Sequence, residues 1–183
     1  MTQKPKVVAV CGSLKFPSRT LVLVEELIAA LGARASFDAH LIKLADIGPR
    51  VGAALQAAEL PARVRADIEA IEHADFIIAA SPVYQASYTG LFKHLFEFVD
   101  YNALAGVPVM LAATGGSERH SLILDHQLRP LFAFFRALTL PMGIYASEAD
   151  FDHYQLVSPA VKAYIALAVE QAHAHLRPRQ SGG

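Results

Sequence analysis

Three short, unbroken runs of apolar residues set the strongest limit on how this chain can fold. They cover residues 7–11, 76–80 and 107–113, and each is followed by small or hydroxyl-bearing residues that open a loop. Continuous apolar runs, rather than alternating ones, are typical of strands buried on both faces of a parallel sheet that helices cover. Weaker strand patterns at residues 40–44 and 138–145 bring the expected strands to five.

Helical patterns fill the intervals between these strands. Apolar residues recur at helical spacing over residues 21–31 and again over residues 64–71. Strands that alternate with helices predict a doubly wound α/β fold, in which a five-stranded parallel sheet lies between two layers of helices. The segment 47–60 carries Gly48, Pro49 and Gly52, and we expect it to be a long loop or an edge segment.

The composition favours one globular domain of ordinary size. With 183 residues, of which 54% are hydrophobic, the chain is long enough to bury a sizeable core without disulfides or metal ions. We expect a single domain over residues 1–176 and a disordered tail over residues 177–183, which ends in Ser-Gly-Gly.

Charge and cysteine content exclude several classes of partner and location. The net charge is -1 and the basic residues are scattered, so neither a nucleic acid nor an acidic membrane surface is an expected partner. Cys11 is the only cysteine, and the polar start of the chain lacks the apolar stretch of a secretion signal. No uncharged apolar run approaches the roughly 20 residues that span a bilayer. These features predict a cytoplasmic protein.

In a doubly wound sheet, ligands bind beyond the carboxyl ends of the strands. The first loop at that edge carries Ser13, Ser18, Arg19 and Thr20 and leads directly into a helix. Free backbone N–H groups and the dipole at a helix N-terminus favour a bound phosphate, and the hydroxyls and the arginine add donors and positive charge. The alternative is that Ser18 only caps the helix and Gly12 only forms the turn.

Two further loops follow the third and fourth strands. The loop at residues 81–90 carries Tyr84 and Tyr88, which either form a wall for a planar ring or cover apolar core. The loop that starts at residue 114 contains Gly115 and Gly116, and glycine lets a backbone come close to a ligand. Three loops of suitable chemistry at one edge predict a ligand site there.

These loops resemble those of the NAD(P)H-dependent FMN reductase family, and in particular the reductase components of two-component alkanesulfonate and methanesulfonate monooxygenases. The motifs are Gly-Ser-x-x-x-x-Ser-Arg-Thr, Ser-Pro-Val-Tyr-x-x-Ser-Tyr-Thr-Gly-Leu-x-Lys and Ala-Thr-Gly-Gly-Ser-x-x-His, after the first, third and fourth strands, and the likeness runs over residues 6–174. The resemblance implies a flavodoxin-like fold, a homodimer or homotetramer, and reduced FMN that is handed to a partner monooxygenase for carbon–sulfur bond cleavage.

The same resemblance assigns an FMN site by position, loop by loop. It implies that the phosphate is held by Ser13, Ser18, Arg19 and Thr20. It places the flavin ring and ribityl chain against Pro82, Val83, Tyr84 and Ser87, and the other side of the flavin against Thr114, Gly115, Gly116 and Ser117. Lys93 also matches the family, although on a helix its role can be structural. NADPH or NADH is the implied reductant.

We expect no side chain to act as a catalytic acid, base or nucleophile. Hydride passes from nicotinamide C4 to flavin N5, so the cofactors carry the chemistry and the protein aligns their rings. The eight histidines lack the spacing of a metal site, and the Gly-x-Ser-x-Gly of serine hydrolases is absent. Cys11, at the end of a strand, is expected to be a buried core residue.

Two other functions are compatible with such a flavin site. A flavodoxin-type electron carrier would keep its FMN and pass single electrons, but such carriers tend to be strongly acidic and this chain is close to neutral. An enzyme that reduces quinones or azo compounds would also keep its flavin bound.

The segment 128–140 predicts a homo-oligomer. It is almost continuously apolar, and it presents more apolar surface than one helix face can bury against its own sheet. The residues concerned are Leu131, Phe132, Phe134, Phe135 and Leu138.

Pro130 predicts an irregular helix near His126. Within the expected helix over residues 121–137, the proline lacks the N–H that would bond to the His126 carbonyl and crowds that carbonyl. Either a proline kink or a widened turn, a π-bulge, relieves the conflict, and π-bulges often occur at functional sites. The resemblance favours the π-bulge, because related sulfonate-system reductases carry a π-helical insertion here, at a subunit interface.

Overall fold

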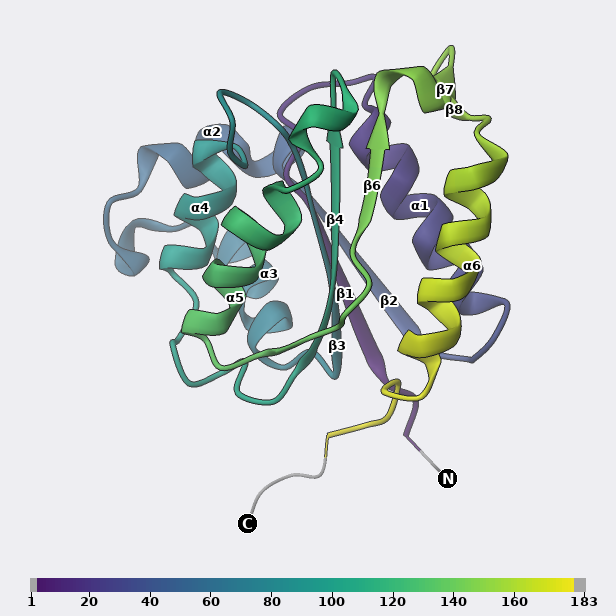
Figure 1. The fold of residues 1–183 in the computed structure, drawn as a ribbon. Coiled ribbons are helices and arrows are strands. Elements are labelled where there is room, and N and C mark those ends of the chain that lie inside the picture. Colours follow the sequence, from purple (N-terminus) through teal and green to yellow (C-terminus); the bar gives the residue numbers. More distant parts are fainter. Residues whose placement is uncertain (1–2, 180–183) are drawn as a thin grey trace.

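A single parallel sheet lies between two layers of helices (Figure 1). The structure, a computed structural model, describes residues 3–179. Strands run in the order β2-β1-β3-β4-β5, and β6 also pairs with β4, all in parallel. The strands are β1 (Lys6–Cys11), β2 (Asp38–Lys43), β3 (Phe76–Pro82), β4 (Pro108–Gly115), β5 (Leu138–Thr139) and β6 (Ile144–Ser147). The predicted flavodoxin-like, doubly wound fold is therefore confirmed.

Helices cover both faces of the sheet. The α-helices are α1 (Arg19–Gly32), α2 (Leu44–Ala53), α3 (Ala62–Glu72), α4 (Gly90–Glu97), α5 (Arg129–Phe134) and α6 (Pro159–His173). Short turns of helix are η1 (Ala57–Glu59), η2 (Glu118–His120), η3 (Leu124–Leu128) and η4 (Glu148–Asp150), and β7 (Phe151–Asp152) with β8 (Gln155–Leu156) forms a small antiparallel hairpin. None of the helices in residues 3–179 is both long and apolar enough to cross a membrane.

Alternate residues of β1 show how the two layers form. Val7 and Ala9 point into a core shared with α1 and α6, whereas Val8 and Val10 point into the core on the side of α2 to α5. All four side chains are buried, which is why the strand reads as an unbroken apolar run.

The fifth strand is split, although the sequence predicts one strand over residues 138–145. Leu138 and Thr139 pair with Pro108 and Val109, and pairing with β4 resumes only at Ile144. Between these points the fifth segment has more residues than β4, so the excess loops out of the sheet. Pro141 lies in that excess and has no N–H for a ladder hydrogen bond.

The prediction of a loop or edge segment over residues 47–60 is wrong, because α2 and η1 occupy most of it. Leu44, Ile47 and Val51 recur at helical spacing and are all buried. A Cβ added to Gly48 or Gly52 would lie 3.1 or 3.0 Å from the Leu91 side chain, so these glycines allow α2 to approach α4 closely. Tertiary packing therefore outweighs the poor helix propensity of Gly and Pro.

The tail predicted to be disordered is placed in part. The backbone N–H of Arg179 donates to Asp75 Oδ1 at 2.6 Å, and its guanidinium donates to the carbonyls of Glu72 and Ala103. Disorder is thus the wrong description for residues 177–179, because these contacts fasten them to the amino-terminal edge of the sheet. Residues 180–183 lie outside the described residues.

The helix predicted over residues 121–137 is irregular near His126, as the position of Pro130 predicts. Residues 124–128 form a π-helix that contains His126, and the N–H of Arg129 bonds to the carbonyl of Leu124 five residues back. Pro130 then stands in the first turn of α5, where its missing N–H costs least. The predicted widened turn at His126 is confirmed.

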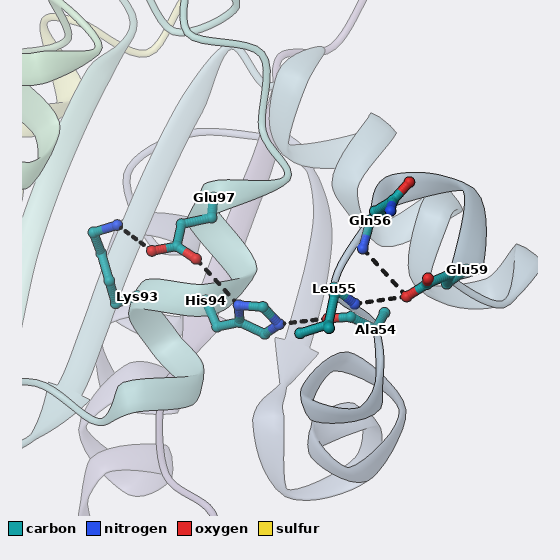
Figure 2. A network of polar contacts seen from close by, with 7 residues as sticks. All are labelled: Ala54, Leu55, Gln56, Glu59, Lys93, His94 and Glu97. Carbon is teal, nitrogen blue, oxygen red and sulfur yellow. Dashed lines mark hydrogen bonds and ion pairs between the residues drawn. The ribbon is translucent and has the colours of Figure 1, made fainter.

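A polar network around His94 joins α4 to the end of α2 (Figure 2). His94 Nε2 lies 2.8 Å from the carbonyl oxygen of Ala54, and Nδ1 lies 3.2 Å from Glu97. Burial lowers the pKa of His94, but the Ala54 carbonyl and then the Glu97 carboxylate more than offset this, so its pKa is raised above 6.5. Only the protonated ring donates to both acceptors.

We expect His94→Ala to lower the free energy of unfolding by about 1 kcal/mol at low pH and by less at high pH. Because its pKa is raised in the folded state, the charge-dependent contribution is complete below the unfolded pKa of 6.5 and is lost as the pH rises through the folded value. Urea unfolding below and above this window measures the difference. In Glu97→Gln the pH dependence of stability should shrink, and an equal cost of His94→Ala at both pH values would contradict the assignment.

Candidate functional site

The loops after β1, β3 and β4 meet at the carboxyl edge of the sheet around a cavity of about 180 Å³. Ten of the twelve residues assigned by the family resemblance line it: Ser13, Ser18, Arg19, Thr20, Pro82, Val83, Tyr84, Thr114, Gly115 and Gly116. Ser87 and Ser117 do not line it. Three residues that the sequence reasoning missed complete the lining, namely Lys15, Pro17 and Tyr154.

The start of α1 supplies hydrogen-bond donors to this cavity. Ser18 caps the helix, because its Oγ accepts from the N–H of Leu21 at 3.1 Å. In the part of the chain that the structure describes, the backbone N–H groups of Arg19 and Thr20 have no protein acceptor. These donors lie at the positive end of a 14-residue helix, an arrangement that suits an anionic group.

Buried hydroxyls link the three loops to one another. Thr20 Oγ1 and Thr114 Oγ1 lie 2.7 Å apart, which ties the first loop to the third. Thr89 Oγ1 donates to the Gly12 carbonyl at 2.9 Å, and the N–H of Val83 donates to the Thr114 carbonyl at 2.8 Å. Each loop is therefore hydrogen-bonded to the other two.

The second loop projects as a tight hairpin beside the cavity. Tyr84 and Ser87 exchange backbone hydrogen bonds across Gln85 and Ala86, both of which have positive φ, as a type I′ turn requires. Tyr84 borders the cavity and is 40% exposed, so it is free to contact a planar ligand. Ser87 is turned away, and its Oγ donates to Gln127. Tyr88 packs on the apolar core, as one of the two readings of this loop expects.

The third loop depends on a close approach at Gly115. The Tyr145 hydroxyl donates to the carbonyl of Ser117 at 2.5 Å and passes directly over Gly115. Burial first, and then the carboxylates of Asp150 and Glu118, raise the pKa of Tyr145, which keeps this hydroxyl protonated and able to donate. Ser117 thus supports the loop rather than lining the cavity.

Arg19 has neighbours from the far end of the chain. Its guanidinium pairs with Glu148 of η4 and lies 5.3 Å from the ring centroid of Tyr154 in the β7–β8 hairpin. Nothing near residue 154 in the sequence signals this, because the contact exists only once the hairpin reaches α1 at the carboxyl edge of the sheet.

Other candidate groups have structural roles. Cys11 is buried, and burial raises the pKa of its thiol to about 11, so it is an inert core residue as expected. Lys93 pairs with Glu97 along α4 at 2.7 Å. Across residues 3–179, no group of three or more His, Cys, Asp or Glu side chains is arranged to hold a metal ion.

A second, smaller cavity of about 160 Å³ adjoins the first, and Val83 lines both. Its other walls come from the hairpin of the second loop and from the π-helix, and they bring together Arg119, His120 and His126. These two neighbouring hollows at the carboxyl edge lie beside the α1 N-terminus and beside the hairpin of the second loop and the π-helix.

Comparison with known proteins agrees with this geometry. The family model of the NADPH-dependent FMN reductases matches residues 5–152, which include all three loops. The chain belongs to this family. It is therefore an NAD(P)H:FMN oxidoreductase, which confirms the class of enzyme that the motifs imply.

Individual relatives of this FMN reductase match over nearly their whole length. An NADH-dependent FMN reductase, SfnF, of Pseudomonas fluorescens is 56% identical, with 97% of each chain covered. An FMN reductase (NADPH) of Pseudomonas aeruginosa is 57% identical, with 94% of this chain and 92% of that protein covered. The crystal structure of an apo NADH:FMN oxidoreductase matches with a TM-score of 0.85 at 29% identity, covering 97% of this chain and 92% of that one.

We expect Gly115→Ala to lower the free energy of unfolding by about 1–3 kcal/mol, as overpacking does. The added Cβ would clash with the Tyr145 hydroxyl and lie 3.2 Å from Tyr145 Cζ. Thermal or urea unfolding measures the loss, and adding Tyr145→Phe should recover part of it. Gly116→Ala is the matched control, because nothing lies within 4 Å of its Cβ. Equal stability of the two alanine variants would show that the close approach at Gly115 is unimportant.

Proposed function

We propose that this reductase binds FMN as an exchangeable substrate and hands the reduced flavin to a partner flavin-dependent monooxygenase that cleaves alkane- or methanesulfonates. One observation carries the FMN site: the free N–H groups of Arg19 and Thr20 and the Arg19 guanidinium converge on one cavity. The overall assignment draws further support from relatives that are named for FMN reduction. We propose a role in cytoplasmic sulfur metabolism.

The donors around the larger cavity fit the phosphate end of FMN. Helix N-terminal amides and an arginine are the groups that bind phosphate monoesters in proteins. The hydroxyls of Ser18 and Thr20 already have partners within the protein, so their first role is to fix the loop and aim its amides. Pro82, Val83 and Tyr84 continue the same wall, in position to contact the flavin ring and ribityl chain.

The protein's share of the reaction is alignment. Bound flavin would supply the hydride-accepting ring. The hairpin tip at Gln85 and Ala86 and the turn at Gly116 expose backbone N–H groups beside that wall, where they would stabilise negative charge on a reduced ring. We therefore assign binding roles to the residues of this edge and propose that hydride transfer uses no side-chain acid or base.

We assign the nicotinamide nucleotide to the hollow beside the π-helix. Arg19 lines the larger cavity, where we assign it to the FMN phosphate, whereas Arg119 lies in the second cavity with His120 and His126. Of the two arginines near the site, Arg119 is therefore the better candidate for the extra phosphate of NADPH. The relatives described above are named for different nicotinamides, NADH in one case and NADPH in the other.

The outer surface supports self-association. Of the five apolar residues on which the prediction for segment 128–140 rests, Leu131, Phe132 and Phe135 are buried within the subunit. Phe134 and Leu138 remain 67% and 47% exposed, and exposed apolar side chains elsewhere on the subunit include Leu122, and Tyr164 and Leu167 of α6. We propose a homodimer or homotetramer that covers part of this surface.

We expect Ser18→Ala combined with Arg19→Ala to weaken FMN binding by on the order of 2–4 kcal/mol, through one lost hydroxyl and one lost charge-assisted bond. Titration of the apoprotein with FMN, followed by quenching of flavin fluorescence, measures the affinity. The matched control is Ser158→Ala combined with Arg34→Ala, which also removes a helix cap and an exposed ion pair but at residues that do not line the cavity. Equal FMN affinity in the two double variants would remove the phosphate site from this loop.

We expect deletion of His126 to restore a regular helix, to tighten FMN retention and to abolish turnover with free FMN. The reason is that the π-turn widens the helix beside the second cavity, and we propose that this width lets flavin leave. Absorbance of the purified variant reports retained flavin, and steady-state assays report turnover. A deletion variant that purifies without flavin and reduces free FMN at the original rate would refute the link.

A further inference from the structure

The β7–β8 hairpin reaches the phosphate side of the larger cavity. It follows β6 and η4 and lies at the carboxyl edge of the sheet, beside the start of α1 (Figure 1). Its turn places His153 and Tyr154 at positive φ, and Tyr154 contributes to the cavity lining. Neither the sequence motifs nor the family resemblance assigns a role to this hairpin.

The hairpin is anchored firmly enough to hold a side chain in place. Asp150 accepts from the N–H and the Oγ of Ser147 at 2.7 and 2.8 Å, which closes the turn of η4. The Asp150 carbonyl in turn accepts from the N–H of Val157, and Leu156 is buried in the core beneath. Glu148 and Tyr154 are therefore carried on a braced segment.

Glu148 and Tyr154 meet Arg19 in different ways. Tyr154 places the face of a neutral ring 5.3 Å from the guanidinium carbon, a cation–π contact that orients Arg19 without neutralising its charge. Glu148 contributes a carboxylate, whose Oε1 lies 2.5 Å from Arg19 Nη2, and this ion pair neutralises the positive charge of Arg19. Glu148 does not line the cavity, so it reaches the site only through Arg19.

We propose that Glu148 competes with the FMN phosphate for Arg19 and thereby sets how weakly this enzyme holds FMN. The inference rests on the proposed FMN site and deepens it. Arg19 binds either the carboxylate of Glu148 or the phosphate of the flavin, and exchange between the two returns FMN to solution. Glu148 is thus a positioning residue that favours FMN as an exchangeable substrate over FMN as a retained cofactor.

The exposure of the ion pair makes such exchange easy. The side chains of Arg19 and Glu148 are 37% and 60% exposed, so their attraction is screened and is easily replaced by another anion. Without the Glu148 carboxylate, Arg19 would keep its position, because the ring of Tyr154 and the first turn of α1 still hold it. Glu148 therefore affects FMN affinity mainly by competing with the phosphate for Arg19, and not by holding Arg19 ready for the phosphate.

The test is the FMN affinity of Glu148→Gln, measured by fluorescence titration of the flavin-free protein. We expect the variant to bind FMN about two- to five-fold more tightly than wild type, the range of an exposed ion pair. Riboflavin, which has no phosphate, should bind both proteins equally. Glu170→Gln is the matched control, because Glu170 of α6 pairs with Arg34, just after α1, at similar exposure, and neither residue lines the cavity. This control should leave FMN affinity unchanged.

A cycle with Arg19→Ala separates competition from simple charge repulsion. If Glu148 acts through Arg19, Glu148→Gln should have no effect on FMN affinity once Arg19 is replaced. Unchanged or weaker FMN binding by Glu148→Gln, an equal gain for riboflavin, or a gain that persists without Arg19 would each overturn the proposal. Different results would refute the proposed FMN site itself. These are wild-type protein that does not bind FMN, or a Ser18 and Arg19 double variant that binds FMN as tightly as wild type.

Discussion

Buried polar groups at the carboxyl edge of the sheet must form hydrogen bonds with one another, and this requirement fixes the geometry of the site. Thr20, Ser81, Thr89 and Thr114 are all buried, and each bonds to another loop or to its neighbour. Within residues 3–179 no buried side-chain nitrogen or oxygen lacks a partner. Because an unmet buried hydroxyl costs about 1–3 kcal/mol, the three loops are held in one relation to each other. The cavity walls are thereby fixed by the fold itself.

Two elements border this fixed set of loops. The β7–β8 hairpin meets Arg19 through an exposed ion pair and an aromatic face, and the π-helix at His126 borders the second cavity. We propose that the three hydrogen-bonded loops align flavin and nicotinamide, whereas the β7–β8 hairpin and the π-helix govern how readily flavin leaves. This division suits an enzyme whose flavin is a substrate, since strong binding to all three loops would hold the product in place.

The sequence predicted what depends on local burial and missed what depends on tertiary contact. Strands buried on both faces leave no polar position, so the runs at β1, β3 and β4 were directly readable. A proline within a helical pattern revealed an irregularity at His126, and the family resemblance favoured a π-turn over a proline kink there. Segment 47–60 was misread because its glycines and proline lower helix propensity, whereas packing against Leu91 decided its structure. Tyr154 and Glu148 had no local signal, since their role follows from where the hairpin comes to lie.

The central claim is that free FMN, rather than a resident flavin, accepts the hydride. The most direct measurement is the rate of NADH or NADPH oxidation by protein purified without added flavin, followed without oxygen as FMN is increased. The account predicts a rate near zero without FMN that rises and saturates, with one FMN reduced for each nicotinamide oxidised. Protein that purifies with one tightly bound flavin and oxidises NAD(P)H, with a separate electron acceptor, at a rate independent of added FMN would contradict it.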